Sequence, residues 1–169
     1  MFKRETSSYS SLPKGRIVVL VHPQIPQNTG NIVRTCAAVG AHLVLVAPLG
    51  FHLEDRHLRR AGLDYWEGVE VRVISDFSDW LIAQSERELP FFFSSHATSR
   101  YSDAPFSSQS ILVFGSESSG LPDWMRERWH SRFLRLPMLP GKRCLNLANS
   151  VSIALYEAWR QCDFIVDSL

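Results

Sequence analysis

The stretch RIVVLVHPQIPQNTGNIVRTCAAVGAHLVLVAP, residues 16–48, determines which class of fold the chain can adopt. Its two ends, 16–22 and 42–48, are short and nearly continuous apolar runs, which are typical of strands covered on both faces. The segment between them predicts a helix that begins near Asn28 and ends just before Gly40. A strand, a helix and a second strand in this order indicate an α/β domain.

The rest of the chain repeats this alternation of apolar runs and helical stretches. Strands are expected at residues 69–74, 91–95, 111–115 and, with a weaker pattern, 132–137. Helices are expected at residues 54–61, 76–86, 122–130 and 145–162. The last of these has the clearest pattern, because its apolar residues recur on one side at every third or fourth position. The sequence therefore predicts a mainly parallel sheet with helices on both faces.

Length and composition indicate one globular domain. We expect a folded body over residues 15–169 behind a loose, Ser-rich tail over 1–14, which lacks the apolar stretch of a secretory signal. Hydrophobic residues make up 45% of the chain and charged residues 21%, a balance that excludes intrinsic disorder. No apolar run reaches the roughly 18–20 residues that cross a bilayer, so we expect no membrane partner. The net charge of +1 argues against a strongly basic protein that binds nucleic acid in bulk.

Several well-known sites are absent from the sequence. No GxGxxG follows the first strand and no GxxxxGK[ST] occurs, which excludes the dinucleotide-binding and P-loop fingerprints. The six histidines form no i,i+4 pair and lie near no cysteine at zinc-ligand spacing, so we expect no metal. The three scattered cysteines, Cys36, Cys144 and Cys162, exclude a disulfide framework and indicate a reducing compartment, the cytoplasm.

Three loops that join predicted strands to predicted helices are the candidates for a binding site. They cover residues 22–34, 114–122 and 136–149. Loops at the carboxyl ends of parallel strands line the binding crevice, so we expect the three to meet. Each also has an ordinary explanation: Arg34 alone is most often a solvated charge, and GSESSGLP alone could be a flexible turn. Taken singly, Cys144 is most often a small filler and Tyr156 a packing residue.

Together these loops carry a family pattern. NTGNIVRTCAAVGA (28–41), LVFGSESSGLP (112–122) and LRLPMLPGKRCLNLANSVSIALYEAWRQ (134–161) resemble the three ordered motifs of the SPOUT class of RNA methyltransferases. HPQIPQNTGNIVR, RRAGLDYWE and LYEAWRQ are similar to one subfamily, the tRNA (cytidine/uridine-34) 2′-O-methyltransferases, which modify the wobble nucleotide. The resemblance covers residues 17–161, almost the whole predicted body.

This resemblance implies a fold and a cofactor. The family has an α/β domain whose C-terminal part, here about residues 91–162, is tied in a deep trefoil knot, a rare exception among protein folds. The knot loops hold S-adenosylmethionine in a bent shape, with no metal, and two chains form the working homodimer. Carried over by motif, the residues that would meet the cofactor, mostly through their backbone, are Phe93, Gly115, Glu117, Leu136, Met138, Cys144, Leu145 and Asn149.

The resemblance also implies roles for catalysis and for RNA. Asn28, Arg34 and Glu117 correspond to the catalytic set, and Arg34 would reach the cofactor of the partner chain. A guanidinium keeps its proton, so we expect Arg34 to bind a phosphate or hydroxyl while a neighbouring acceptor or water takes the proton. Glu117 would orient Arg34 or offset the sulfonium charge. The residues expected to contact the anticodon stem-loop of tRNA are Arg34, Arg59, Arg60, Lys142, Arg143 and Tyr156.

One departure from the family leaves the role of a cysteine open. Cys144 stands where the family usually has serine, which leaves a backbone-mediated role intact and weakens a hydroxyl-mediated one. Cys144 is also the one motif cysteine that could attack a base during C5 methylation, although no proton acceptor is evident beside it. Two alternatives stay open, 2′-O-methylation of another tRNA or rRNA nucleotide and a catalytically silent RNA-binding dimer. The presence of Asn28, Arg34, Glu117 and Asn149 favours the enzyme over the silent dimer.

Overall fold

The structure, a computed structural model, describes residues 3–4, 14–52, 68–83 and 89–165. The helix predicted at 54–61 lies outside these ranges, as do Arg59 and Arg60. Within the described residues, none of the helices is long and apolar enough to cross a membrane.

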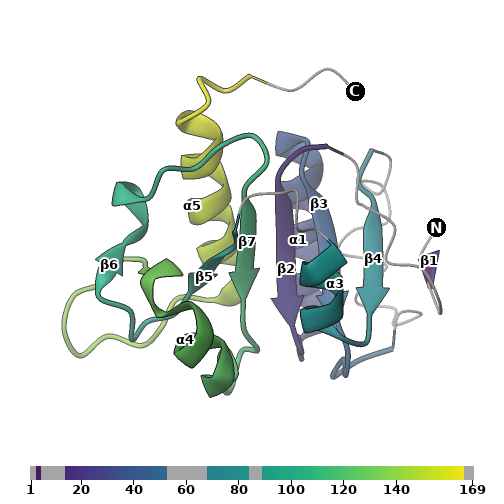
Figure 1. Ribbon diagram of the computed structural model, residues 1–169, viewed down its shortest axis with the longest axis horizontal. Coiled ribbons are helices and arrows are strands. Elements are labelled where there is room, and N and C mark those ends of the chain that lie inside the picture. The colour runs from purple at the N-terminus through teal and green to yellow at the C-terminus, as the bar shows by residue number, and fades with distance from the viewer. Residues whose placement is uncertain (1–2, 5–13, 53–67, 84–88, 166–169) are drawn as a thin grey trace.

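The described strands form a single parallel sheet (Figure 1). The strands are β1 (Lys3–Arg4), β2 (Ile17–Val21), β3 (His42–Val46), β4 (Val71–Ile74), β5 (Phe91–Phe93), β6 (Ser99–Arg100), β7 (Ile111–Phe114) and β8 (Phe133–Arg135). Their order across the sheet is β1-β4-β3-β2-β7-β5-β8-β6, and all neighbouring pairs are parallel. The predicted α/β class and mainly parallel sheet are therefore confirmed.

Helices cover both faces of this sheet, as predicted. The helices are α1 (Pro26–Val39), α3 (Phe77–Ala83), α4 (Asp123–Trp129) and α5 (Leu147–Arg160), with 3-10 turns η2 (Tyr101–Asp103) and η3 (His130–Arg132). In Figure 1, α1 and α5 lie behind the sheet, whereas α3 and α4 lie in front of it. Helix α5 packs against α1 and β7, so the first and the last helix lie in the same layer.

Alternation along the strands divides the core into two clusters. Val18 and Leu20 of β2 belong to the cluster that includes the buried faces of α1 and α5. Val19 belongs to the opposite cluster, with Trp80 of α3 and Met125 of α4. Every residue of β2 and β3 is buried, because each strand has a helical layer on both sides.

The predicted helices that fall within the described residues are present, with shifts at their ends. Helix α1 begins at Pro26, two residues before the predicted start at Asn28, because proline is favoured in the first turn and the cap comes from elsewhere in the chain. It ends at Val39, just before Gly40 as predicted, and the φ of 66° at Gly40 is the left-handed conformation that glycine adopts without strain. The amide of Asp79 donates to the Asp76 carboxylate at 3.0 Å, so Asp76, the first residue of the predicted helix 76–86, caps α3.

Two described strands were not predicted. Strand β1 lies within the segment assigned to a loose tail and pairs with β4. Residues 5–13 lie outside the described ranges, so the loose tail over 1–14 stays a prediction. Strand β6 is a two-residue, exposed edge strand beside β8, too short and too polar to have a sequence pattern.

Parallel pairing places all the carboxyl ends at one edge of the sheet. The order of strands reverses between β2 and β7, because the chain continues to β3 on one side of β2 and later builds β7 and β5 on the other. Open α/β sheets bind their ligands at such a switch point. The loops after β2, β5, β7 and β8 are thereby brought to the same place.

Candidate active site

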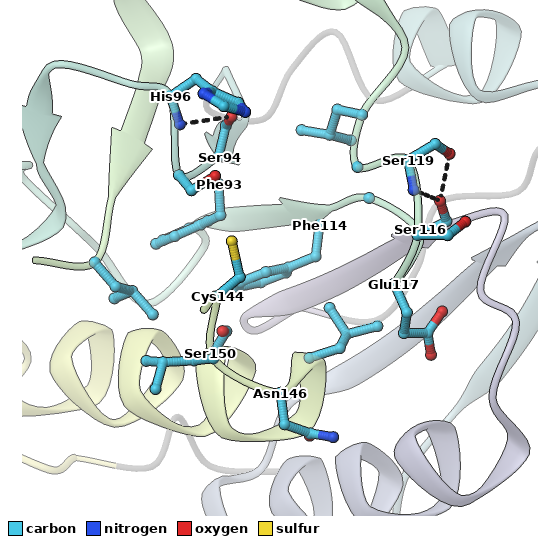
Figure 2. Close-up of a pocket in the computed structure, with 18 of the residues that line it drawn as sticks. Phe93, Ser94, His96, Phe114, Ser116, Glu117, Ser119, Cys144, Asn146 and Ser150 are labelled. Carbon is cyan, nitrogen blue, oxygen red and sulfur yellow. Dashed lines mark hydrogen bonds between the residues drawn. The ribbon is translucent and has the colours of Figure 1, made fainter. Parts of the chain in front are cut away.

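A cavity of about 750 Å³ lies where these loops meet. Its walls come from the loops that follow β5, β7 and β8 and from the start of α1. Figure 2 shows the side chains of these segments converging on one space, with Phe93 from the end of β5, Glu117 from the loop after β7 and Cys144 from the loop after β8. The volume falls within the range of ordinary ligand pockets, about 300–1,000 Å³. The three predicted loops therefore meet in one pocket, as the sequence suggested.

Aromatic rings form one wall of the cavity. Phe93 and Phe114 end neighbouring strands in register, and their rings stack with centroids 4.5 Å apart. Both are largely buried in the core, so the wall is rigid. The Cys144 thiol points toward these rings in Figure 2. The wall can hold a flat apolar group against the carboxyl ends of β5 and β7.

The loop after β7 is closed on itself. Ser116 and Gly120 exchange two backbone hydrogen bonds of 3.1 and 3.0 Å, and the hydroxyls of Ser116 and Ser119 lie 2.7 Å apart. A Cβ at Gly115 would lie 2.0 Å from the carbonyl carbon of Gly120, so only glycine allows this close approach. The interpretation as a merely flexible turn is thus not what the structure shows: this loop is a compact, hydrogen-bonded wall of the pocket.

Glu117 projects from this loop to the start of α1. Its Oε2 accepts from the amide of Gln24 at 2.8 Å, and its Oε1 accepts from the amide of Ile25 at 3.2 Å. Oε1 also accepts from Nδ2 of Asn28 at 3.0 Å. Helix α1 has no side-chain cap of its own, and the carboxylate supplies both the acceptor and the negative charge that a helix N-terminus favours.

Asn28 extends this contact to the third loop. Its Oδ1 accepts from Nδ2 of Asn146 at 2.9 Å, and Oδ1 of Asn146 accepts from the amide of Ala148 at 2.8 Å, which caps α5. Asn28 is only 5% exposed, so both ends of its amide are satisfied away from bulk water. One hydrogen-bonded chain thus joins the three motif segments through Glu117, Asn28 and Asn146.

The pocket contains most of the predicted cofactor residues. Those that line it are Phe93, Gly115, Glu117, Leu136, Met138, Cys144 and Leu145. Asn149 does not line it, although Asn146 and Ser150 do, because residues four apart share a helix face and Asn149 lies on the exposed side of α5. The expected contact between Asn149 and the cofactor therefore stays a prediction, because Asn149 does not line the pocket of its own chain.

The predicted RNA-binding residues that the structure describes lie outside the pocket. Arg34 is on the exposed side of α1, and Tyr156, 45% exposed, is on the exposed side of α5. Lys142 and Arg143 are exposed in the loop after β8. Of the predicted catalytic set, Asn28 and Glu117 line the pocket and Arg34 does not. Arg59 and Arg60 are not among the described residues.

Sequence reasoning did not assign several lining residues. Asn146 is one of them, because its hydrogen bond to Asn28 crosses 118 positions and has no sequence signal. The loop after β5 adds Ser94, Ser95 and His96 to the wall. The start of α4 adds Asp123 and Arg126, which the sequence predicted only as helical. Over the part of the chain that the structure covers, no group of three or more His, Cys, Asp or Glu side chains could hold a metal ion.

The fold and the pocket define a class: an α/β protein with a ligand site at the switch point of a parallel sheet, walled by three ordered motif loops. The model of the SpoU rRNA Methylase family matches residues 15–156. The chain belongs to this family. The resemblance seen in the sequence is thereby confirmed at the level of the family.

Comparison with known proteins shows how similar this chain is to individual relatives in sequence and in structure. A tRNA (cytidine(34)-2′-O)-methyltransferase of Burkholderia cenocepacia (strain HI2424) is 47% identical over 149 residues, which cover 87% of this chain and 96% of the relative. A structure that describes 2-OH methylation of C/U34 on tRNA superposes with a TM-score of 0.82 at 41% identity, covering 89% of this chain and 99% of the other. An AdoMet-bound rRNA methyltransferase of Sinorhizobium meliloti has a TM-score of 0.69 at 25% identity, covering 86% and 56%.

Proposed function

We propose that this protein transfers a methyl group from S-adenosylmethionine to the ribose 2′-hydroxyl of nucleotide 34, a cytidine or uridine, in the anticodon loop of tRNA. The observation that carries the proposal is the hydrogen-bonded chain Glu117–Asn28–Asn146, which joins the three family motifs around one cavity. The relatives named for cytidine-34 of tRNA match almost their whole length, which supports the same substrate here.

The cavity fits the proposed methyl donor. A nucleoside with an amino-acid arm needs one flat apolar surface for the base and polar surface for the arm. The stacked rings of Phe93 and Phe114, with Leu136 and Met138 of the loop after β8, supply the first. The polar loops 94–96 and 116–119 supply the second. Backbone groups of the loops would make most of the polar contacts, so the replacement of the family serine by Cys144 is compatible with binding.

When bound, the donor supplies an electrophilic methyl group on a sulfonium, so the protein needs neither a metal nor a covalent intermediate. The residues of this chain position the reactants. Glu117 and Asn28 are positioning residues in this account, because both hold the start of α1 against the loops that wall the pocket. Fixed alignment of two reactants can supply several kcal/mol, by analogy with effective molarities worth about 7–11 kcal/mol.

Arg34 supplies the cationic group at the ribose. It binds the phosphate or the hydroxyl beside the attacking oxygen, and a water or a neighbouring acceptor removes the proton, because a guanidinium does not release its own. In this proposal Arg34 acts at the pocket of a second chain, and its place on the exposed side of α1, outside its own pocket, supports this.

A homodimer supplies that second chain. Three of the predicted site residues that lie outside the pocket, Arg34, Asn149 and Tyr156, are on the exposed outer side of the layer formed by α1 and α5. The same side leaves Ile153 39% exposed beside Tyr156. A partner packed on this layer would cover the apolar surface and would bring the three residues to an interface.

Two further parts of the proposal concern the fold and the compartment. We propose that residues 91–162 form a deep trefoil knot within the domain 15–169. The placement of β5 between β7 and β8, against their order in the chain, supports this threading. The reaction is assigned to the cytoplasm, and the three unpaired cysteines support a reducing compartment.

The experiment that tests the function is nucleoside mass spectrometry of tRNA from a strain that lacks this protein. The proposal predicts that 2′-O-methylated cytidine or uridine disappears at position 34 and returns when the wild-type chain is supplied. Return of the modification with an Arg34→Ala, Glu117→Gln double variant, or its loss from a different tRNA or rRNA position, would contradict the proposal.

A further inference from the structure

One wall of the pocket carries charges that the mechanism above does not use. Asp123 and Arg126 both line the cavity from α4, and His96 lines it from the loop after β5. Figure 2 shows His96 and Ser94 on one side of the space and Glu117 and Asn146 on the other. His96 and Ser94 therefore lie across the space from two members of the hydrogen-bonded chain that joins the motifs.

Arg126 is held at this wall by weak contacts. Its Nη2 donates to Oγ of Ser94 at 3.3 Å, and its guanidinium lies 5.8 Å from the centre of the Phe133 ring. The same Ser94 hydroxyl accepts from the amide of His96 at 3.3 Å. These contacts hold the guanidinium beside the loop after β5. They use one of its five N–H donors for a hydrogen bond.

The two opposite charges on α4 do not pair. Asp123 and Arg126 are three residues apart, a spacing that allows an ion pair, yet across the described ranges neither has a partner of opposite charge within 4.0 Å. Glu117, the other acidic residue of the pocket, already accepts three hydrogen bonds at α1. The pocket thus has one negatively charged side chain, Asp123, and one positively charged side chain, Arg126, that lack a partner of opposite charge among the described residues and can bind a ligand.

We infer that Asp123 and Arg126, with His96, form the subsite for the amino-acid end of the methyl donor: Asp123 binds the ammonium, and Arg126 and His96 bind the carboxylate. The inference rests on the proposed function. An acidic and a basic side chain on one wall, neither of them in an ion pair among the described residues, suit a zwitterionic ligand. A phosphate of the RNA would gain from Arg126 but would be repelled by Asp123, so it fits the wall less well.

Three ligands distinguish the binding contribution of the ammonium from that of the carboxylate in the amino-acid arm. S-Adenosylhomocysteine carries both, its decarboxylated analogue carries only the ammonium, and 5′-methylthioadenosine carries neither. We expect Arg126→Gln to weaken S-adenosylhomocysteine binding about fivefold, because both partners are partly solvated, and to leave the other two ligands unchanged. Asp123→Asn should weaken S-adenosylhomocysteine and the decarboxylated analogue, and leave 5′-methylthioadenosine unchanged. Isothermal titration calorimetry measures all three.

Arg128→Gln is the matched control, because Arg128 is an exposed arginine of the same helix that contacts the Trp129 ring and does not line the pocket. It should bind all three ligands as the wild type does. Unchanged 5′-methylthioadenosine binding also shows that each variant is folded. Arg126→Lys, which keeps the charge, should recover part of the lost affinity.

Two results would overturn the subsite, and a third would refute the proposed function. Arg126→Gln could weaken all three ligands equally, which would mean that Arg126 only shapes the wall. It could leave S-adenosylhomocysteine binding intact, with or without weaker binding of an anticodon stem-loop; weaker RNA binding would assign the guanidinium to a phosphate. Failure of the wild type to bind any of the three at millimolar concentration would instead refute the proposed function.

Discussion

The carboxylate of Glu117 offers the sharpest test of how the site is built. Glu117→Gln keeps the shape of the side chain, but only one of its two terminal atoms can still accept a hydrogen bond. Either the amide of Gln24 or the amide of Ile25 with Nδ2 of Asn28 would then face an NH₂ group. The start of α1 would also lose its nearby negative charge.

The cost follows from these contacts. A hydrogen bond to a charged group contributes about 1.5–3 kcal/mol when buried, and the two backbone bonds here are exposed, so the loss is at the lower end. Adding about 0.5 kcal/mol for the charge at the helix end gives about 2 kcal/mol in the free energy of unfolding. For a chain of this length that corresponds to a fall of about 4–8 °C in Tm.

The assay is thermal unfolding of the protein without ligands, at one fixed protomer concentration because a dimer gains stability with concentration. Glu127→Gln is the control, since Glu127 is exposed on α4 and should leave Tm unchanged. A Glu117→Gln variant with wild-type Tm and a hundredfold loss of turnover would refute the reasoning. That result would mean that the carboxylate acts on the reacting groups instead of holding α1.

A double-mutant cycle extends the test to the next link. Asn28→Ala removes the partner that Glu117 shares with Asn146. Because the two side chains are in contact, the stability losses of Glu117→Gln and Asn28→Ala should not add, with a coupling of at least about 0.5 kcal/mol. Strict additivity would show that the two motifs are not joined through this contact.

Four further predictions concern single groups. Arg34→Ala should reduce turnover about 100-fold while S-adenosylhomocysteine binding persists; near-normal turnover with tRNA bound would remove Arg34 from the reaction. Cys144→Ser should be nearly silent in methyl transfer and cofactor binding, whereas a trapped protein–RNA adduct in the wild type alone would assign the thiol as a nucleophile. Binding of the anticodon stem-loop should weaken as salt rises, with S-adenosylhomocysteine binding little affected; salt-independent RNA binding would oppose phosphate contacts. Burial raises the pKa of the Cys36 thiol from 9.0 to about 12, so the thiol ionises at a lower pH in the unfolded chain than in the folded one. The stability that the neutral buried thiol contributes is therefore present below pH 9 and is lost as pH rises toward 12. Above pH 9 the wild type should lose up to about 1.4 kcal/mol more per pH unit than Cys36→Ala, and parallel stability curves would contradict this.

The strands could be predicted because burial leaves a pattern in the sequence. Residues 17–21 and 42–46 are covered on both faces, so nearly every position is apolar and the run is recognisable without its neighbours. Ser99 and Arg100 form a strand with exposed side chains, and nothing in two polar residues distinguishes it from a loop. The pairing order of the strands also has no local signal, because β5 lies beside β7 and β8 through contacts distant in sequence.

The site was predictable in its parts and not in its connections. The motif resemblance identified Glu117 and Asn28, but their hydrogen bond spans 89 positions and depends on the folded sheet. Likewise, α1 begins at Pro26 because its cap comes from the loop after β7, which no inspection of residues 22–34 could show. Asp123 and Arg126 appeared as ordinary helix residues, and only the folded chain turns them toward the cavity.

The most direct measurement combines purified protein, a methyl donor with a labelled methyl group and an unmodified tRNA anticodon stem-loop. Two stem-loops are compared, one with a ribose and one with a 2′-deoxyribose at position 34, and the products are mapped by mass spectrometry. The account predicts one labelled methyl on the ribose of nucleotide 34 in the first stem-loop and none in the second. A label on a base, a label at another position, or equal labelling of both stem-loops would contradict it.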